Sequence, residues 1–166
     1  MTTSTNVSRR RFLGTSAVAA GGLTFAFAIP FGSDANAQTL PSEVNAWVVV
    51  KPDDSIIIRI ARSEMGQGTL TGLSQLVAEE LDCDWARVTT EYPTPGQNLA
   101  RKRVWGNFST GGSRGIRESQ EYVRQGGAAA RMMLVQAAAA GWNVPAAECS
   151  AAAGVITHAG SSRRTT

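Results

Sequence analysis

Residues 64–68 read Glu-Met-Gly-Gln-Gly and place two glycines and a carboxamide between two segments that both have the pattern of ordered structure. Glycine adopts positive φ and lets another group approach the backbone closely. The free N–H groups that open a following helix favour an anion, such as an oxyanion or a phosphate. The carboxamide of Gln67 offers two donors and an acceptor in one plane, which suits the edge of a heterocycle or an oxo group. The alternative is a tight turn whose Gln67 faces solvent.

The glycine spacing argues against a dinucleotide fingerprint. Gly66, Gly68 and Gly72 follow the pattern G-x-G-x-x-x-G, whereas that fingerprint requires G-x-G-x-x-G. Gly72 therefore falls one residue late, inside the expected helix.

Residues 64–68 form a first junction between two ordered segments, and residues 109–113 form a second junction of similar composition. Ser109, Thr110, Gly111, Gly112 and Ser113 combine hydroxyl side chains with two glycines before another expected helix. Two junctions of this kind could converge on one extended anionic ligand. The alternative is a flexible loop that ends at Ser113 as the N-cap of the helix.

Several elements must position these junctions. β-Branched runs at 44–50 and 55–60, separated by the turn residues 51–54, predict a β-hairpin. Apolar residues at helical spacing predict a helix from Thr69 to Leu81, and a strand is expected at 87–92. The rest of the chain predicts, in order, a loop with little regular structure, a long helix, a short helical turn and a last strand, at residues 93–112, 114–141, 144–148 and 154–158.

This order of elements predicts an α+β fold in which helices pack on a mixed sheet that includes a β-hairpin. Trp105 and Phe108 are expected to anchor the 93–112 loop to the core. Gly126 and Gly127 predict close packing, a bend or a break in the long helix. The C-terminal residues 158–166 contain no expected element, so the last strand is expected at the edge of a truncated core.

The first 37 residues have the build of an export signal. Ser8-Arg9-Arg10-Arg11-Phe12-Leu13 precedes a moderately apolar segment, and Ala35-Asn36-Ala37 forms an A-x-A cleavage site. The adjacent arginines resemble a twin-arginine (Tat) signal, which predicts the Tat export machinery as a partner and a periplasmic location. An uncleaved membrane anchor is the alternative. Tat substrates cross the membrane folded, commonly because they carry a cofactor.

The composition excludes some functions. The chain of 166 residues has a net charge of +3, and removal of residues 1–37, with three arginines and one aspartate, leaves +1. This balance gives no electrostatic basis for nucleic-acid binding. Cys83 and Cys149 fit no metal spacing and are expected to be free, buried thiols, although a disulfide is possible in an oxidising compartment. His158, the only histidine, is expected on the surface.

Together these segments resemble a known family. Residues 64–68, followed by Thr71, Gln75, residues 78–81 and a strand at Val88, resemble the molybdopterin-binding large subunit of the xanthine dehydrogenase and aldehyde oxidase family. The similarity is closest to its exported branch, the isoquinoline 1-oxidoreductase beta subunit type. The resemblance covers the whole chain, and its specificity lies in the ordered combination of segments.

The resemblance implies a function and a set of site residues. It places a first set of residues against the molybdenum-pterin: Gly66, Gln67 and Gly68. It places a second set against the phosphates of the dinucleotide: Thr110, Gly111, Gly112 and Ser113. The implied cofactor is molybdopterin cytosine dinucleotide. The implied reaction is hydroxylation of an aldehyde or an N-heterocycle with oxygen from water. Electrons would leave through iron–sulfur clusters on a small partner subunit, with a cytochrome c as a further acceptor.

The chain also departs from the family pattern. Family members are several times longer, and their catalytic glutamate lies near the far C-terminus, so nothing in these 166 residues corresponds to it. Residues 38–166 are therefore expected to form an incomplete molybdopterin-binding domain that is inactive alone. The alternative is a small exported non-catalytic α+β module whose glycine turns only connect elements.

Overall fold

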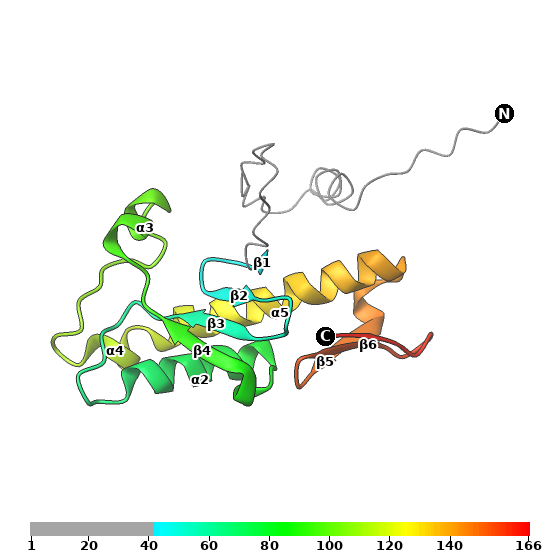
Figure 1. The fold of residues 1–166 in the computed structure, drawn as a ribbon, viewed down its shortest axis with the longest axis horizontal. Coiled ribbons are helices and arrows are strands. Elements are labelled where there is room, and N and C mark those ends of the chain that lie inside the picture. The colour runs from blue at the N-terminus through cyan, green and yellow to red at the C-terminus, as the bar shows by residue number, and fades with distance from the viewer. Residues whose placement is uncertain (1–41) are drawn as a thin grey trace. The chain divides into compact units, whose positions relative to one another are not determined.

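The computed structural model of the chain describes residues 42–166 (Figure 1). The predicted export signal lies outside the described residues. Within them, helices and two small sheets form an α+β arrangement, which confirms the expected fold class. None of the described helices is both long enough and apolar enough to cross a membrane.

The first sheet has the strand order β1-β2-β3-β4. β2 (Val48–Val50) and β3 (Ile56–Arg59) form the predicted hairpin, with Val48 opposite Ile58. β4 (Val88–Glu91) runs parallel to β3, so β3, α2 and β4 make one crossover unit. The sequence did not predict β1 (Ser42–Glu43), which pairs with β2.

Two helices cover this sheet. α2 (Thr69–Leu81) begins and ends as predicted, and it buries Leu73, Val77 and Leu81. α5 (Gln120–Trp142) lies alongside α2 (Figure 1), and its Val123 and Ala130 belong to the same apolar cluster as the inward side chains of β2 and β3. The hydrophobic core therefore lies between the hairpin and these two helices.

The long helix predicted at 114–141 is divided. α4 (Arg114–Arg117) is a separate turn, and α5 begins only at Gln120. The break lies at residues 118–119, where the buried Ser119 accepts hydrogen bonds from Arg62 and from Tyr122, three residues further on. The helix continues without a break through Gly126 and Gly127, which confirms close packing among the three explanations considered.

The prediction of little regular structure at 93–112 is wrong in part. α3 (Pro95–Ala100) occupies this segment, and it starts with a capping box between Thr94 and Gln97. The anchoring role of Trp105 is confirmed, since its side chain is only 2% exposed and meets the Trp47 ring edge-on at 6.4 Å. Phe108 packs at the margin of the same cluster.

The C-terminal part forms a second, three-stranded sheet, β5-β6-β7. The predicted last strand is β6 (Val155–His158), and the helical turn before it is the 3-10 turn η2 (Ala146–Glu148). β5 (Cys149–Ala152) and β7 (Arg163–Thr165) pair on either side of β6. The expectation that nothing follows β6 was wrong, because a four-residue turn returns the polar tail to pair with it.

Candidate functional site

The turn at 64–68 is organised around the carboxylate of Glu64. Its two oxygens accept hydrogen bonds from the backbone N–H groups of Gly66 at 2.7 Å, Gly68 at 2.9 Å and Leu70 at 3.0 Å. The pKa of Glu64 is lowered, chiefly by the N–H of Leu70 and then by that of Gly68. The chain can wrap around its own carboxylate because Gly66 and Gly68 have φ values of 94° and 74°.

The anion at the start of α2 is the carboxylate of Glu64. The sequence predicted an oxyanion or a phosphate, but the position at Leu70 N is occupied by Glu64 itself. An acidic residue six positions before the second residue of a helix, with glycines between them, is the sequence signal for this arrangement. From the sequence, Glu64 was placed in this turn but was assigned no role.

The side chain of Gln67 is also used within the turn. Its Nε2 donates to the carbonyl of Ser63 at 2.8 Å, and its Oε1 accepts from the N–H of Met65 at 2.6 Å. Gln67 is exposed, as expected for the alternative in which it faces solvent. Both its Nε2 and its Oε1 are nevertheless held by hydrogen bonds within the turn. Any ligand contact by Gln67 would use the remaining donor and acceptor capacity of this fixed amide.

The two predicted junctions lie next to each other. The N–H of Ser63 donates to the hydroxyl of Thr110 at 3.1 Å, which links the two segments across 47 positions of sequence. Gly115 of α4 packs on Thr69, where an added Cβ would lie 2.7 Å from the Thr69 hydroxyl. Figure 1 shows α4 close to the first turn of α2. The convergence of the two junctions is therefore a property of the fold.

Ser113 lies at the N-cap position of α4, as the alternative interpretation expected, although its side chain does not cap the helix. Its φ is 58°, in the left-handed region, and its side chain makes no capping hydrogen bond to α4. The preceding Gly112 also has a positive φ, of 69°. The cationic side chains of this segment, Arg114 and Arg117, each lie 3.6 Å from the carboxylate of Glu118, so the expected anion is supplied by the chain.

A family comparison bears on these two segments. The profile of the molybdopterin cofactor-binding domain matches residues 6–166, which is nearly the whole chain and includes both junctions. The chain belongs to this family. Membership confirms the resemblance to the molybdopterin-binding subunits of the xanthine dehydrogenase and aldehyde oxidase type, and it makes this chain part of an oxidoreductase family.

Two relatives are substantially similar to this molybdopterin cofactor-binding chain. The isoquinoline 1-oxidoreductase subunit beta of Brevundimonas diminuta is 36% identical over 96% of the chain and 21% of its own length. The membrane-bound aldehyde dehydrogenase (pyrroloquinoline-quinone) of Gluconacetobacter polyoxogenes is 33% identical over 93% of the chain and 20% of its own length. The chain thus spans about a fifth of the length of these relatives.

The residues of the two junctions fit a flat cofactor that approaches the backbone. A Cβ placed on Gly66, Gly68 or Gly111 would find no heavy atom within 4 Å, so the Cβ side of these positions is open, whereas the N–H groups of Gly66 and Gly68 already bond to Glu64. At Gly112 the nearest atom to such a Cβ is the Nε of Arg114, at 4.0 Å. The molybdopterin-binding domain therefore presents two adjacent open stretches of main chain.

A buried arginine that the sequence did not predict as a site residue contacts both segments. Arg62 is 5% exposed, and its Nε donates to the hydroxyl of Ser119 at 2.9 Å. Its Nη1 donates to Asn107 Oδ1 at 3.1 Å and to the carbonyl of Ser109. Arg62 therefore links the segment between β3 and the first junction to the start of the second junction.

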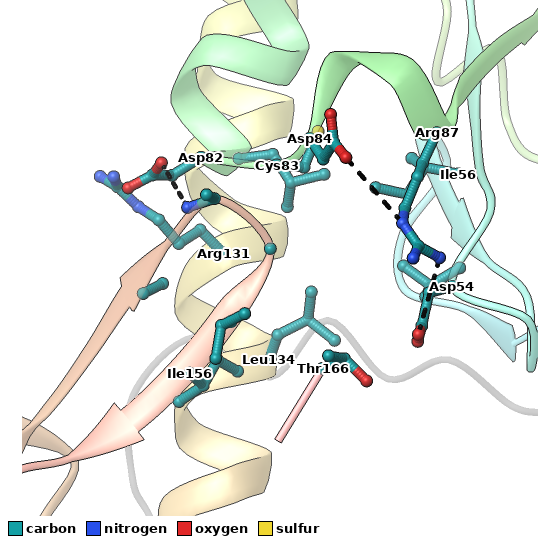
Figure 2. Close-up of a pocket in the computed structure, with 16 residues that line it drawn as sticks. Asp54, Ile56, Asp82, Cys83, Asp84, Arg87, Arg131, Leu134, Ile156 and Thr166 are labelled. Carbon is teal, nitrogen blue, oxygen red and sulfur yellow. Dashed lines mark hydrogen bonds and ion pairs between the residues drawn. The ribbon is translucent and has the colours of Figure 1, made fainter. Parts of the chain in front are cut away.

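A cavity of about 270 Å³ lies elsewhere in the domain, between the hairpin β2–β3, the end of α2 and the second sheet (Figure 2). Leu134, Ile156 and Ile56 give it an apolar wall, and Asp82, Asp84 and Arg131 stand at its margin (Figure 2). It is at the C-terminal end of the 13-residue helix α2, about 20 Å from the helix start that carries the two junctions. The cavity is therefore separate from the residues predicted to contact the cofactor.

The His, Cys, Asp and Glu side chains of the described residues were the other candidates for metal binding. Residues 42–166 hold no group of three or more His, Cys, Asp or Glu side chains placed to bind a metal ion. Cys83 and Cys149 are free, and burial raises the pKa of Cys83 to about 11. The prediction of an exposed His158 is wrong, because its side chain is 5% exposed and bonds to Glu148 at 2.9 Å and to Ser161 at 2.7 Å.

Proposed function

We propose that this chain forms part of the cofactor cradle of a molybdenum hydroxylase that oxidises an aldehyde or an N-heterocycle with water as the oxygen source. The observation that carries the proposal is the junction contact, in which Ser63 N–H donates to the Thr110 hydroxyl at 3.1 Å, within a chain of the molybdopterin cofactor-binding family. The proposal extends to molybdopterin cytosine dinucleotide as the cofactor.

Each junction has its own part in holding the cofactor. The backbone of Gly66 and Gly68 would lie against the pterin on its open side, where an added Cβ would meet no atom within 4 Å. Residues 110–113 would face the phosphates of the dinucleotide, with hydroxyl groups and exposed main chain as donors. Glu64 and Gln67 keep the first junction in shape through hydrogen bonds inside the turn. When bound, such a cofactor supplies the oxidation–reduction chemistry, and the chain supplies its position.

Partners and location are part of the same proposal. The names of the relatives describe a beta subunit and a membrane-bound dehydrogenase, which supports an assembly with other subunits. We propose a small iron–sulfur subunit as the direct electron partner and a cytochrome c as a further acceptor. Arg9 and Arg10 would direct export to the periplasm. Replacement of both by lysine should retain the precursor in the cytoplasm on cell fractionation.

The name of one relative includes a different cofactor, pyrroloquinoline-quinone. This makes quinone binding the second candidate for the chain. The family profile favours the pterin, because the profile spans residues 6–166 and describes molybdopterin binding.

Metal and nucleotide content distinguish the two candidates. The full-length protein that contains this chain would be produced with its partner subunits and the cofactor-insertion machinery. We expect about one molybdenum and one CMP per complex, with CMP released by acid hydrolysis. Quinone in place of molybdenum would favour the second candidate and contradict the proposed function. Absence of both would leave the non-catalytic module as the better description.

A further inference from the structure

Arg62, which is buried, differs in the charge around it from the partly buried Arg59, three residues earlier. Arg59, on β3, is paired with two carboxylates, those of Glu43 at 3.0 Å and Glu91 at 2.6 Å. Arg62 has no carboxylate within 4 Å among residues 42–166, although its side chain is 95% buried. A buried charge is costly unless an opposite charge or several hydrogen bonds compensate it.

The acidic residues next in sequence are committed elsewhere. Glu64 accepts from the backbone of its own turn, and Glu118 lies between Arg114 and Arg117. Every hydrogen-bond partner of Arg62 among the described residues is instead a neutral oxygen, from Ser119, Asn107 or Ser109. The positive charge of Arg62 is therefore solvated by dipoles and is not neutralised by any described side chain.

The unused part of the guanidinium is its Nη2 group. Nε and Nη1 make all the hydrogen bonds of Arg62, and Nη2 has no partner among residues 42–166. The group lies where the two junctions meet, because Ser63, the next residue, bonds to Thr110, and Ser109 bonds to Arg62 itself. A ligand at the contact between the two junctions would lie next to a cation that no described carboxylate neutralises.

We propose that Arg62 is an anion-binding residue whose guanidinium takes a phosphate or diphosphate group held between residues 64–68 and residues 107–113. Guanidinium groups bind phosphate oxygens through paired, charge-assisted hydrogen bonds, and burial strengthens such contacts. The inference deepens the proposed function, because a dinucleotide cofactor would bring this group to the junction. It would hold equally for free diphosphate, which makes it testable without the cofactor.

The test measures binding of inorganic pyrophosphate and of CDP to the 166-residue chain by isothermal titration calorimetry at constant ionic strength. Both probes should bind the wild-type chain. Arg62→Gln should weaken binding by about tenfold or more, since a charge-assisted hydrogen bond is lost. Arg62→Lys, which keeps the charge and loses the planar fork, should weaken binding by about threefold or more.

Arg59→Gln is the matched control, since it removes a partly buried arginine of the same region whose charge is already neutralised. Its affinity for both probes should stay within about twofold of wild type. Equal losses in Arg59→Gln and Arg62→Gln, no loss in Arg62→Gln, or no binding of either probe to the wild-type chain would overturn the inference. If Arg62→Gln does not fold, an unchanged affinity in Arg62→Lys would overturn it as well. Molybdenum and CMP in the full-length complex report on the proposed function separately, so the two can fail independently.

Discussion

Glu64 fixes the start of α2 through three backbone N–H groups, so the shape of the first junction depends on the ionisation of one carboxyl group. The same N–H groups would otherwise have attracted a ligand anion. A cofactor at this junction would therefore meet a surface that is already neutralised at the helix start. A positive charge that no described carboxylate neutralises lies instead at Arg62, between the two junctions.

The stability of the chain should depend on pH through Glu64. Its pKa is lowered from the usual 4.5, so its contribution to the free energy of unfolding is fully present above the unfolded-state pKa. The contribution is lost as the pH falls through the lower folded-state value. Glu64→Gln should lower the melting temperature at pH 6, and the difference from wild type should shrink as the pH falls below about 4.

Glu121→Gln is a suitable control for this experiment, because the Glu121 carboxylate accepts only a 3.3 Å hydrogen bond from Gln125. Its melting temperature should follow that of wild type at both pH values. A difference between Glu64→Gln and wild type that stays constant from pH 6 to pH 3 would show that the N–H groups do not depend on the carboxylate.

Gln67 should affect cofactor chemistry more than folding. Gln67→Ala removes two hydrogen bonds inside an exposed turn, to Ser63 and Met65, at a cost of about 1 kcal/mol in unfolding free energy. The glycine backbone beside it would lose its fixed position, so turnover of the full-length complex should fall by about tenfold or more. Steady-state kinetics and molybdenum content of the same preparation check this expectation. Gln75→Ala, on an exposed position of α2, is the control that should retain turnover.

At the residue scale, the sequence predicted where the two junctions lie, but it did not predict the hydrogen-bond partners of their residues. Glycine positions are visible in the sequence because positive φ has a residue preference. The partners of Glu64 and Gln67 are set by the folded path of residues 63–70, and those of Arg62 by a contact across 57 positions to Ser119. Such long-range contacts leave no local pattern.

Among the elements, α5 is positioned by two glycines that allow close approach. A Cβ on Gly126 would lie 2.8 Å from the Trp47 ring, and one on Gly127 would lie 2.5 Å from the backbone carbonyl of Val77 in α2. The two helices could not pack at this distance with larger residues. This packing also sets the position of Ser119, one residue before α5, which binds Arg62.

Gly127→Ala should therefore destabilise the chain although alanine favours helix. Because the clash is with backbone, the helices must separate, and the free energy of unfolding should fall by about 1–3 kcal/mol. Gly141→Ala in the same helix meets no atom within 4 Å, so it should raise the free energy of unfolding by up to about 1 kcal/mol. Chemical denaturation of both variants gives the comparison. Stabilisation by both alanines would contradict the packing.

The elements that the sequence missed have identifiable causes. α3 has a capping box between Thr94 and Gln97 and a proline at its first position, and this local signal was available. Both features lie in the segment for which the sequence predicted little regular structure. The break before α5 has no such signal, since it depends on the burial of Ser119. β7 is exposed and polar, so no alternation of apolar residues marked it.

At the scale of the whole described domain, the two sheets are held unequally. The apolar cluster joins the first sheet to α2 and α5, and it contains no residue of β5, β6 or β7. Two backbone N–H groups of the β5–β6 turn bond to Asp82, from Gly154 to its carbonyl at 2.7 Å and from Ala153 to its carboxylate at 3.1 Å. The cavity in Figure 2 is lined both by the end of α2, at Leu81 and Asp82, and by the second sheet, at Ile156.

The second sheet should consequently open before the rest of the domain. Local unfolding follows the segments with the least buried apolar contact, so the amides of β6 (Val155–His158) should exchange with deuterium about tenfold or more faster than those of β3 (Ile56–Arg59). Asp82→Ala removes the bond to Ala153 and should accelerate exchange in β6 while exchange in β3 stays as in wild type. Asp82→Asn, which keeps a neutral acceptor at the same place, should behave more like wild type. Mass spectrometry of peptides from both strands gives the rates, and equal protection of β3 and β6 would mean that the cavity does not weaken the attachment of the second sheet.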